Sequence, residues 1–504
     1  MTPINSDDAI KDIATILAAE PDPNLVVMVH GFNNPEDAVF RTYVAASEAI
    51  QKDSIIQNRR GLVCVGYRWP SERMGQPYKG TWDALPTLPT WILYLGALVV
   101  LATFPLVYWA QDFRDWQYLS WLWNGKTAHV LIMLGWTIAG LVLAAALLRT
   151  IVYFRDNYRA ANYGVPDLIQ IIRAIDGQIK IIEDKEGQRR RKPVQLSFIG
   201  HSMGGFVVTN AIRTLSDLFT TTVSNINDDY NPQKGDKPSR RIGHAFELMR
   251  FVLVSPDIPA EALLSTRGNF LASALRRFDE AYLFSNEGDA VLRQISTLAN
   301  YFVFPTKSRD YGFRLGNIEV LSSDCGFLTV PEKEFLSRLR IGNLTLQELY
   351  DALQEARAKR RGAPPSNIPA DTPLPRIFTY FDCTDYRDAG VDGEVRPLLT
   401  RGLLKKETDY TAKLRWYQHL RLLFAYLIFQ RPNVHGGYFE GELSTQLIYR
   451  LACLGYQETM QAFGGEKAVS NMCAEKSIRV LVSPQLMSQG KASAPAAASQ
   501  PAPR

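Results

Sequence analysis

Short runs of apolar residues alternate along the chain with stretches in which apolar positions recur at helical spacing. The short runs predict buried strands, at residues 25–29, 62–68, 194–200, 249–255 and 281–284. The amphipathic stretches predict helices at residues 36–50 and 166–182 and a helix that starts at Met203. Continuous apolar strands separated by helices predict an α/β fold, with a mostly parallel sheet covered by helices on both faces.

Two much longer apolar segments interrupt this alternation. Residues 91–110 (WILYLGALVVLATFPLVYWA) and 130–148 (VLIMLGWTIAGLVLAAALL) contain no charged side chain. A helix of about 20 apolar residues crosses the roughly 30 Å of hydrocarbon in a bilayer. The linker between them is rich in tryptophan and tyrosine, which favour the membrane interface. A pair of buried core helices is the alternative, but such helices rarely run this long without charge. The pattern therefore predicts an inserted two-helix transmembrane hairpin and a lipid membrane as partner.

The distribution of charge around the hairpin predicts its orientation. Basic residues lie near its outer ends, whereas the connecting loop has two basic residues offset by two acidic ones; the outer residues are Arg73, Lys79, Arg149, Arg155 and Arg159. Positive charge favours the cytoplasmic side. We therefore expect a multi-pass protein whose termini and main body are cytoplasmic.

The hairpin and two low-complexity stretches divide the chain into parts. We expect a first core part at residues 1–88, the hairpin at 89–152, a second core part at 153–330, a helical insertion and proline-rich linker at 331–375, a last core part with C-terminal helices at 376–486, and a disordered tail at 487–504.

Composition narrows the class of protein further. The 56 basic and 51 acidic residues give a net charge of +5, too small an excess to indicate a nucleic-acid partner. The five cysteines lie far apart without a C-x-x-C pair, which fits neither a zinc site nor a disulfide framework. A reducing compartment agrees with the cytoplasmic orientation.

One glycine-rich motif carries candidate chemistry. Residues 200–204, GHSMG, fit G-x-S-x-G and lie where the strand at 194–200 meets the helix from Met203. A nucleophilic serine needs this sharp strand-to-helix turn with small flanking residues. We therefore predict Ser202 as a nucleophile. The backbone N–H of Met203, together with that of Phe32 or Asn33 in HGFNN, would form the oxyanion hole.

A base and an acid should follow the serine in the chain. Of the histidines, His435 lies in a glycine-flanked loop, RPNVHGGYF, that suits a mobile base, whereas His419 lies in an aromatic helix. We favour His435, with His419 as the alternative. Asp289, after the strand at 281–284, is the favoured acid, although it could simply cap the next helix. Asp257 after the strand at 249–255 is the alternative, and Glu287 lies beside Asp289.

These motifs together resemble the α/β-hydrolase superfamily, and within it a bacterial esterase/lipase-like group of serine hydrolases. The matching segments are VHGFN at 29–33, WPS at 69–71, GHSMG at 200–204, PDI at 256–258 and HGGY at 435–438. The resemblance implies Ser202 as nucleophile, Asp289 as acid and His435 as base. It also implies the bacterial inner membrane as location. The chain departs from the pattern in the inserted hairpin. Either 317–323 or 376–383 could supply the last strand before the histidine.

The sequence thus predicts a membrane-anchored serine hydrolase that cleaves an acyl ester, of a lipid or another compound, through an acyl-enzyme. Such a triad needs neither a metal nor a cofactor. The same triad would serve a thioesterase or an amidase. The alternative from another class is a non-catalytic membrane scaffold that retains the hydrolase fold.

Overall fold

The computed structural model describes residues 6–71, 140, 151–187, 192–218, 240–259, 277–296, 314–317, 319–320, 326–328, 339–341, 344–345, 378–389, 393–400, 414, 416–429 and 433–482. The chain divides into two compact units, one formed by Met1–Ser71 with Asn157–Arg504 and one by Glu72–Asp156. In the second unit, Arg155 pairs with the buried Asp156 at 2.9 Å. The following paragraphs concern the first unit.

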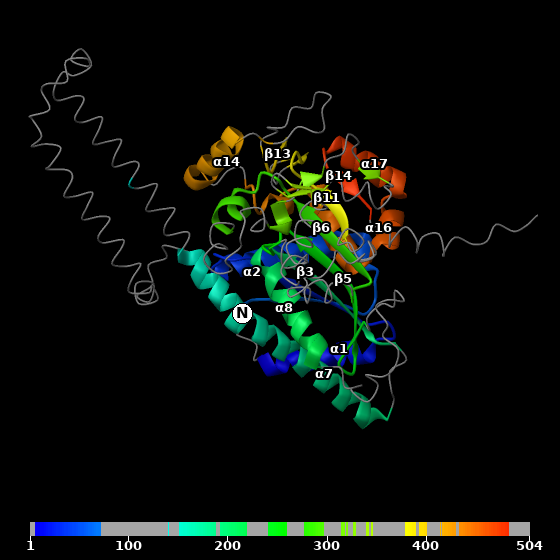
Figure 1. The fold of residues 1–504 in the computed structure, drawn as a ribbon. Helices are drawn as coiled ribbons and strands as arrows, with labels where there is room; N and C mark the ends of the chain where they lie inside the picture. The colour runs from blue at the N-terminus through cyan, green and yellow to red at the C-terminus, as the bar shows by residue number, and fades with distance from the viewer. Residues whose placement is uncertain are drawn as a thin grey trace, which may run out of the picture. The chain divides into compact units, whose positions relative to one another are not determined.

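A mostly parallel sheet organises the first unit (Figure 1). Among the described residues its strand order is β2 (Leu62–Tyr67), β1 (Asn24–Val29), β3 (Val194–His201), β5 (Phe246–Val254), β6 (Glu280–Ser285), β11 (Phe378–Asp382), β14 (Arg479–Leu481) and β8 (Gly326–Leu328). Neighbours from β2 to β11 run parallel. β14 runs antiparallel to β11, and β4 (Arg241–Ile242) antiparallel to β5. The prediction of an α/β architecture with a mostly parallel sheet is confirmed.

Helices cover both faces of this sheet. On one face, α2 (Glu36–Lys52) and α15 (Glu442–Cys453) contribute Ile50 and Leu447 to a core that also contains Val26 and Met28 of β1. On the other face lies α8 (Met203–Leu218), where a Cβ on Gly205 would come within 2.9 Å of the Leu253 side chain. Since successive strand residues point to opposite faces, both faces need apolar side chains. This explains the continuous apolar runs.

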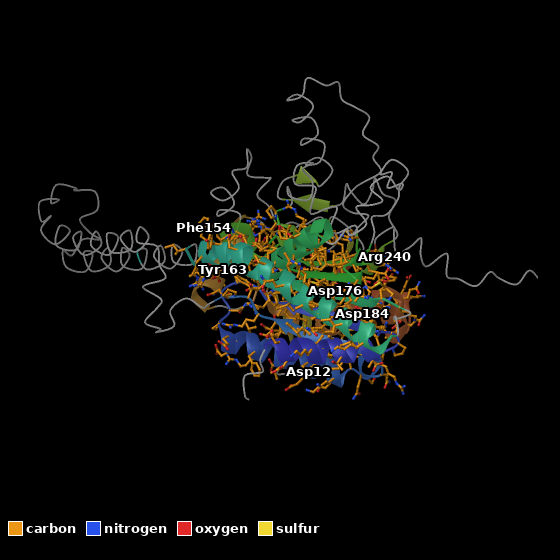
Figure 2. The ribbon with its side chains drawn as sticks, turned by 90° about the horizontal axis from the view of Figure 1, so that it is seen from below. Asp12, Phe154, Tyr163, Asp176, Asp184 and Arg240 are labelled. Atoms are coloured by element: carbon orange, nitrogen blue, oxygen red, sulfur yellow. The ribbon has the colours of Figure 1, made fainter. Side chains whose placement is uncertain are left out.

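Two more helices pack beside α8. α7 (Val165–Glu186) packs against α8, and α1 (Ser6–Ala19) packs against α7 and also contacts β2. Figure 2 shows α1 and α7 side by side, with Asp12 on α1 and Asp176 and Asp184 on α7. Pro166 lies at the start of α7, directly after the π-helical turn η3 (Ala160–Gly164). The predicted helix at 166–182 is therefore confirmed, with slightly wider bounds.

Shorter elements complete the described part. Two small sheets are formed by β10 (Leu344–Thr345), β9 (Leu339–Ile341) and β7 (Glu319–Val320), and by β12 (Arg387–Ala389) and β13 (Val395–Pro397). Further helices are α3 (Ser54–Gln57), α14 (Trp416–Phe429), α16 (Tyr456–Ala462) and α17 (Glu466–Glu475). Single turns are π-helical at η3 (Ala160–Gly164) and η6 (Val291–Ser296), and 3-10 at η8 (Leu315–Asn317) and η10 (Gly437–Phe439).

The sequence analysis left two stretches, 317–323 and 376–383, as candidates for the last strand before the histidine, and the second of them joins the main sheet. β11, within 376–383, pairs in parallel with β6. β7, within 317–323, pairs instead with β9 in a separate small sheet. The sequence analysis did not predict β14, because a strand of three residues leaves almost no periodicity to detect.

Within the part of the chain that the structure describes, none of the helices combines the length and apolar character needed to span a bilayer. The segments 91–110 and 130–148, apart from Gly140, lie outside the described residues. The hairpin therefore stays a prediction. The expected tail at 487–504 and most of 331–375 also lie outside them.

Tyr43 on α2 contacts the ends of two neighbouring strands, β1 and β2, that lead to the candidate site. Its hydroxyl lies 2.6 Å from the carbonyl oxygen of Tyr67 and 3.0 Å from that of Met28. We expect Tyr43→Phe to lower the free energy of unfolding by about 1–2 kcal/mol, because these carbonyls lose a donor in a largely buried place. Urea unfolding measures the change.

Tyr158→Phe is the matched control, because the Tyr158 side chain is 61% exposed. It should stay within about 0.5 kcal/mol of the unchanged protein. Equal stabilities of the two variants would contradict the role assigned to Tyr43.

Candidate active site

Ser202 occupies the strained turn between β3 and α8. Its φ is 54°, a left-handed conformation that is uncommon for a residue other than glycine, and its side chain is fully buried. Main-chain hydrogen bonds hold the turn. The N–H of Ser202 donates to Val254 O at 2.9 Å, and its carbonyl accepts from Asp257 N and Gly205 N at 3.0 Å each. The serine thus lies where the sequence analysis predicted, on the turn that a nucleophile requires.

The glycines of the motif are required by close packing of the strand end against the helix start. A Cβ on Gly200 would lie 2.7 Å from the Cα of Gly205. A Cβ on Gly204, the second glycine of the motif, would clash with the carbonyl oxygen of Val29 at the end of β1. Both glycines of G-x-S-x-G are therefore required by backbone atoms that approach this turn closely.

The loop after β1 lies directly against the serine. A Cβ on Gly31 would lie 2.8 Å from the Cβ of Ser202 and 3.2 Å from its Oγ. A side chain at this position would crowd Ser202, so the close approach of the loop requires glycine. The proposed donors are placed nearby: Met203 follows Ser202 and is buried, and the Phe32 ring lies 6.3 Å from the His435 ring. The oxyanion roles of Phe32 and Met203 stay predictions.

Two aromatic side chains hold this loop in place. The His30 ring stacks on Trp69, with centroids 5.3 Å apart and planes 2° apart. Trp69 Nε1–H donates to His30 O at 2.9 Å, and His30 Nδ1 lies 2.7 Å from Gly31 O. Burial lowers the pKa of His30 to about 4, so the ring is neutral at neutral pH. His30 therefore stabilises the loop as an uncharged donor.

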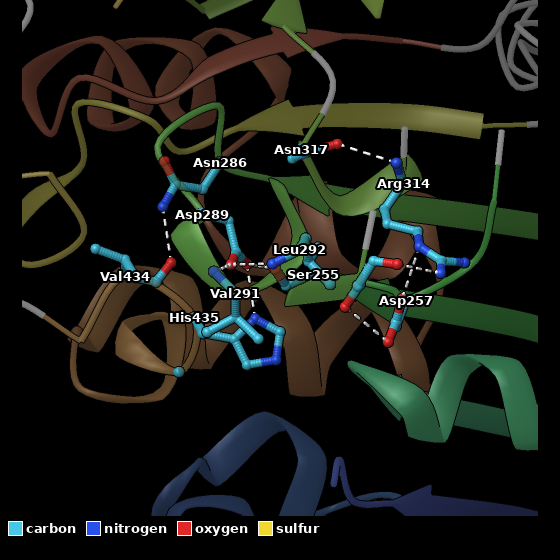
Figure 3. Close-up of polar contacts among 12 residues, drawn as sticks. Ser255, Asp257, Asn286, Asp289, Val291, Leu292, Arg314, Asn317, Val434 and His435 are labelled. Atoms are coloured by element: carbon cyan, nitrogen blue, oxygen red, sulfur yellow. Dashed lines mark hydrogen bonds and ion pairs between the residues drawn. The ribbon is translucent and has the colours of Figure 1, made fainter. Parts of the chain in front are cut away.

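His435 and Asp289 form a buried pair although they are 146 positions apart. Nδ1 of His435 lies 2.6 Å from Oδ2 of Asp289 (Figure 3). The other oxygen, Oδ1, accepts the N–H groups of Val291 and Leu292 at 3.0 Å each, at the start of η6. Asp289 is thus both a helix cap and the partner of His435. Asp289 can serve both as helix cap and as acid, because Oδ1 accepts the helix N–H groups while Oδ2 binds His435.

The environment of His435 favours its protonated form. Burial opposes a charge on the ring, but the charge and the hydrogen bond of Asp289 outweigh it and raise the pKa of His435 above 6.5. Its carbonyl group is also held, since His201 Nε2 lies 3.1 Å from His435 O. Burial, with the neighbouring His435, lowers the pKa of His201 to about 3, so His201 is a neutral donor. A second contact links the loops, because Asn286 Nδ2 donates to Val434 O at 2.8 Å.

The alternative acid and base belong to other pairs. Asp257 Oδ1 lies 3.0 Å from Arg314 Nε, and Oδ2 accepts from Ser296 Oγ at 3.1 Å (Figure 3). His419 Nε2 on α14 lies 3.6 Å from Glu287 Oε1. The structure therefore brings His435 together with Asp289, and it places Asp257 and His419 in separate contacts.

Two reactive atoms at this site have no hydrogen-bond partner among the described residues. They are Ser202 Oγ and His435 Nε2, and both are buried. A buried polar atom is normally paired, because leaving it unpaired costs about 1–3 kcal/mol. One atom can donate a proton and the other can accept it. Since neither has a partner, the two are not hydrogen-bonded to each other, and proton transfer between them needs a closer approach of serine and imidazole.

Three residues of this site make contacts that the sequence analysis did not predict, although it had indicated that His201 orients a loop. Trp69 holds the loop after β1, His201 holds the carbonyl of His435, and Ser255 Oγ donates to Asp289 Oδ2 at 2.5 Å. His201 and Trp69 lie within quoted motifs, so their proximity to the site was detectable but their contacts were not. For Ser255, only its position at the end of a predicted strand could have indicated a role.

Groups of three or more potential metal ligands do not occur among the described residues. Comparisons with protein-family models, with curated proteins and with solved structures found no match. The contacts of the described residues therefore carry the functional argument.

Replacing the acid should change the titration of His435. We expect Asp289→Asn to lower the pKa of His435 from its raised value, because burial then acts unopposed by the carboxylate charge. An NMR titration of the His435 ring measures this shift. Asp257→Asn is the matched control and should produce a smaller fall. A larger fall in the control would identify Asp257 as the acid.

Proposed function

We propose that the chain is a serine hydrolase of the α/β-hydrolase superfamily, esterase- or lipase-like, that cleaves an acyl ester. The observation that carries the proposal is the meeting of three features at one end of the sheet. These are Ser202 in its strained turn, the Gly31 loop against its hydroxyl, and the His435–Asp289 pair. The order of parts supports it, since Ser202 follows β3, Asp289 follows β6 and His435 follows β11.

Each residue has a distinct chemical task in this proposal. His435 Nε2 takes the proton of Ser202 as its oxygen attacks the acyl carbonyl, and the backbone N–H groups of Phe32 and Met203 stabilise the oxyanion. The protonated His435 then gives its proton to the leaving alcohol. Water, activated by the same ring, releases the acid from the acyl-enzyme. Asp289 keeps Nδ1 of His435 protonated, so that Nε2 is the basic nitrogen.

The second part of the proposal is that the protein is anchored in a membrane. Segments 91–110 and 130–148 would anchor the hydrolase to a membrane, with its catalytic part in the cytoplasm, in a bacterium at the inner membrane. The α14 helix exposes Tyr417 and Leu420, at 48% and 39%, which suits contact with a lipid surface. A lipid or another acyl ester near the bilayer is therefore the favoured substrate. Thioester and amide bonds are chemically accessible to the same triad.

A fluorophosphonate probe tests the catalytic part directly. We expect the wild-type protein to be labelled covalently and Ser202→Ala to lose labelling completely, since the probe reacts only with an activated serine. His435→Ala should slow labelling by about 100-fold or more, because the base is gone. Intact-mass measurement detects the adduct.

His419→Ala is the matched control for the base and should be labelled at nearly the wild-type rate. Failure of the wild-type protein to react would favour the non-catalytic scaffold. Loss of labelling in His419→Ala alone would reassign the base.

Membrane anchoring is tested by extraction of the full chain from membranes with alkaline carbonate. We expect the wild-type protein to stay in the membrane and the double variant Leu98→Arg, Leu141→Arg to be extracted, because each central arginine costs about 2.5–3.5 kcal/mol of insertion free energy. The double variant with isoleucine at both positions should behave as wild type. Extraction of the wild-type protein would contradict the hairpin.

A further inference from the structure

Ser255, at the end of β5, combines backbone strain with complete burial. Its φ is 44°, and it immediately precedes Pro256, a position at which extended backbone is favoured. Glycine would fit this conformation best. A strained residue persists where the surrounding structure over-determines its conformation, often at a functional site. The side chain of Ser255 is therefore the feature to examine.

That side chain reaches the same oxygen atom that binds His435. Ser255 Oγ donates to Asp289 Oδ2 at 2.5 Å, and His435 Nδ1 lies 2.6 Å from that oxygen (Figure 3). With the Val291 and Leu292 N–H groups on Oδ1, four donors surround the Asp289 carboxylate. A carboxylate accepts about four hydrogen bonds. The set fixes the rotation of the group.

We propose that Ser255 is a positioning residue: its hydroxyl holds the Asp289 carboxylate against His435 and moderates how strongly that carboxylate attracts the ring proton. This inference rests on the proposed function for its catalytic meaning, because Ser255 acts through Asp289 and not on the substrate. The left-handed backbone is what directs Ser255, at the end of β5, towards the loop after β6. The main chain supports that conformation, since Ser255 N–H donates to Phe284 O at 2.9 Å.

Removal of the Ser255 hydroxyl should change the pKa of His435 in one direction, upwards. Oδ2 would then share its charge with His435 alone, which strengthens the attraction for the imidazolium and raises the pKa of His435 further. Other titratable groups near this set are Asp257, which acts in the same direction with a smaller effect, the neutral His201, and Tyr438, whose hydroxyl faces Ser255 and Asp289. Burial raises the pKa of Tyr438, so its hydroxyl stays neutral and adds no charge when Ser255 is replaced.

Two substitutions distinguish the effect of the Ser255 hydroxyl from the effect of its backbone strain. Ser255→Ala removes the hydroxyl and keeps a strained backbone, whereas Ser255→Gly removes both. Ser296→Ala is the matched control, because it deletes a buried serine hydroxyl that donates to the other aspartate, Asp257. Each variant of the full chain is measured by NMR titration of His435 and by the pH dependence of fluorophosphonate labelling.

We expect Ser255→Ala and Ser255→Gly to raise the pKa of His435 equally, by about half a unit. The acidic limb of the labelling profile should move by the same amount, about threefold slower labelling below the limb. Ser296→Ala should titrate as wild type. Wild-type titration in both Ser255 variants would overturn the proposal, and so would a shift in Ser255→Ala alone, which would assign the effect to strain. Absence of labelling in the wild-type protein would overturn the proposed function, while the NMR titration would still decide the role of Ser255.

Discussion

The parallel alignment of five strands is the constraint on which the rest of the site depends. β1, β3, β5, β6 and β11 run side by side in one direction, and their final residues are in register: Val29 with Gly200, His201 with Val254, and Val254 with Phe284. Phe284 in turn pairs with Phe381. Every loop that follows these strands must therefore emerge at the same edge. The parallel strands alone therefore bring together residues that are far apart in the chain.

Because this edge of the sheet is buried, the polar side chains there need hydrogen-bond partners within the protein. Asp289 is fully buried and accepts four hydrogen bonds, and His435 is nearly buried beside it. A buried charge is tolerated only when its hydrogen-bonding capacity is filled. Strain gathers at the same edge. Of the four non-glycine residues with positive φ in the described part of the chain, Asn33, Ser202 and Ser255 lie in the loops of the site. Such clustering is typical of functional sites.

Much of this arrangement could be predicted because the signals are local. The apolar runs identified β1, β2, β3, β5 and β6, since buried parallel strands need apolar residues on both faces. GHSMG identified the Ser202 turn, because tight backbone packing excludes larger residues at Gly200 and Gly204. The pairing of His435 with Asp289 was chosen over His419 and Asp257 from loop character and chain order. That choice agrees with the contacts, but the spacing of 146 positions gave no local signal for it.

The sequence by itself determined the parts: which segments are strands, where the turn with Ser202 forms, and which side chains could act as base and acid. These follow from properties of neighbouring residues, namely periodicity, glycine spacing and apolar content. Only the tertiary structure decided the partners. Asp257 pairs with Arg314, His419 lies beside Glu287, and Ser255 shares an oxygen of Asp289 with His435. Such choices depend on strand register and on backbone conformation at single residues, because an atom's nearest neighbours in a folded chain are set by packing between distant segments.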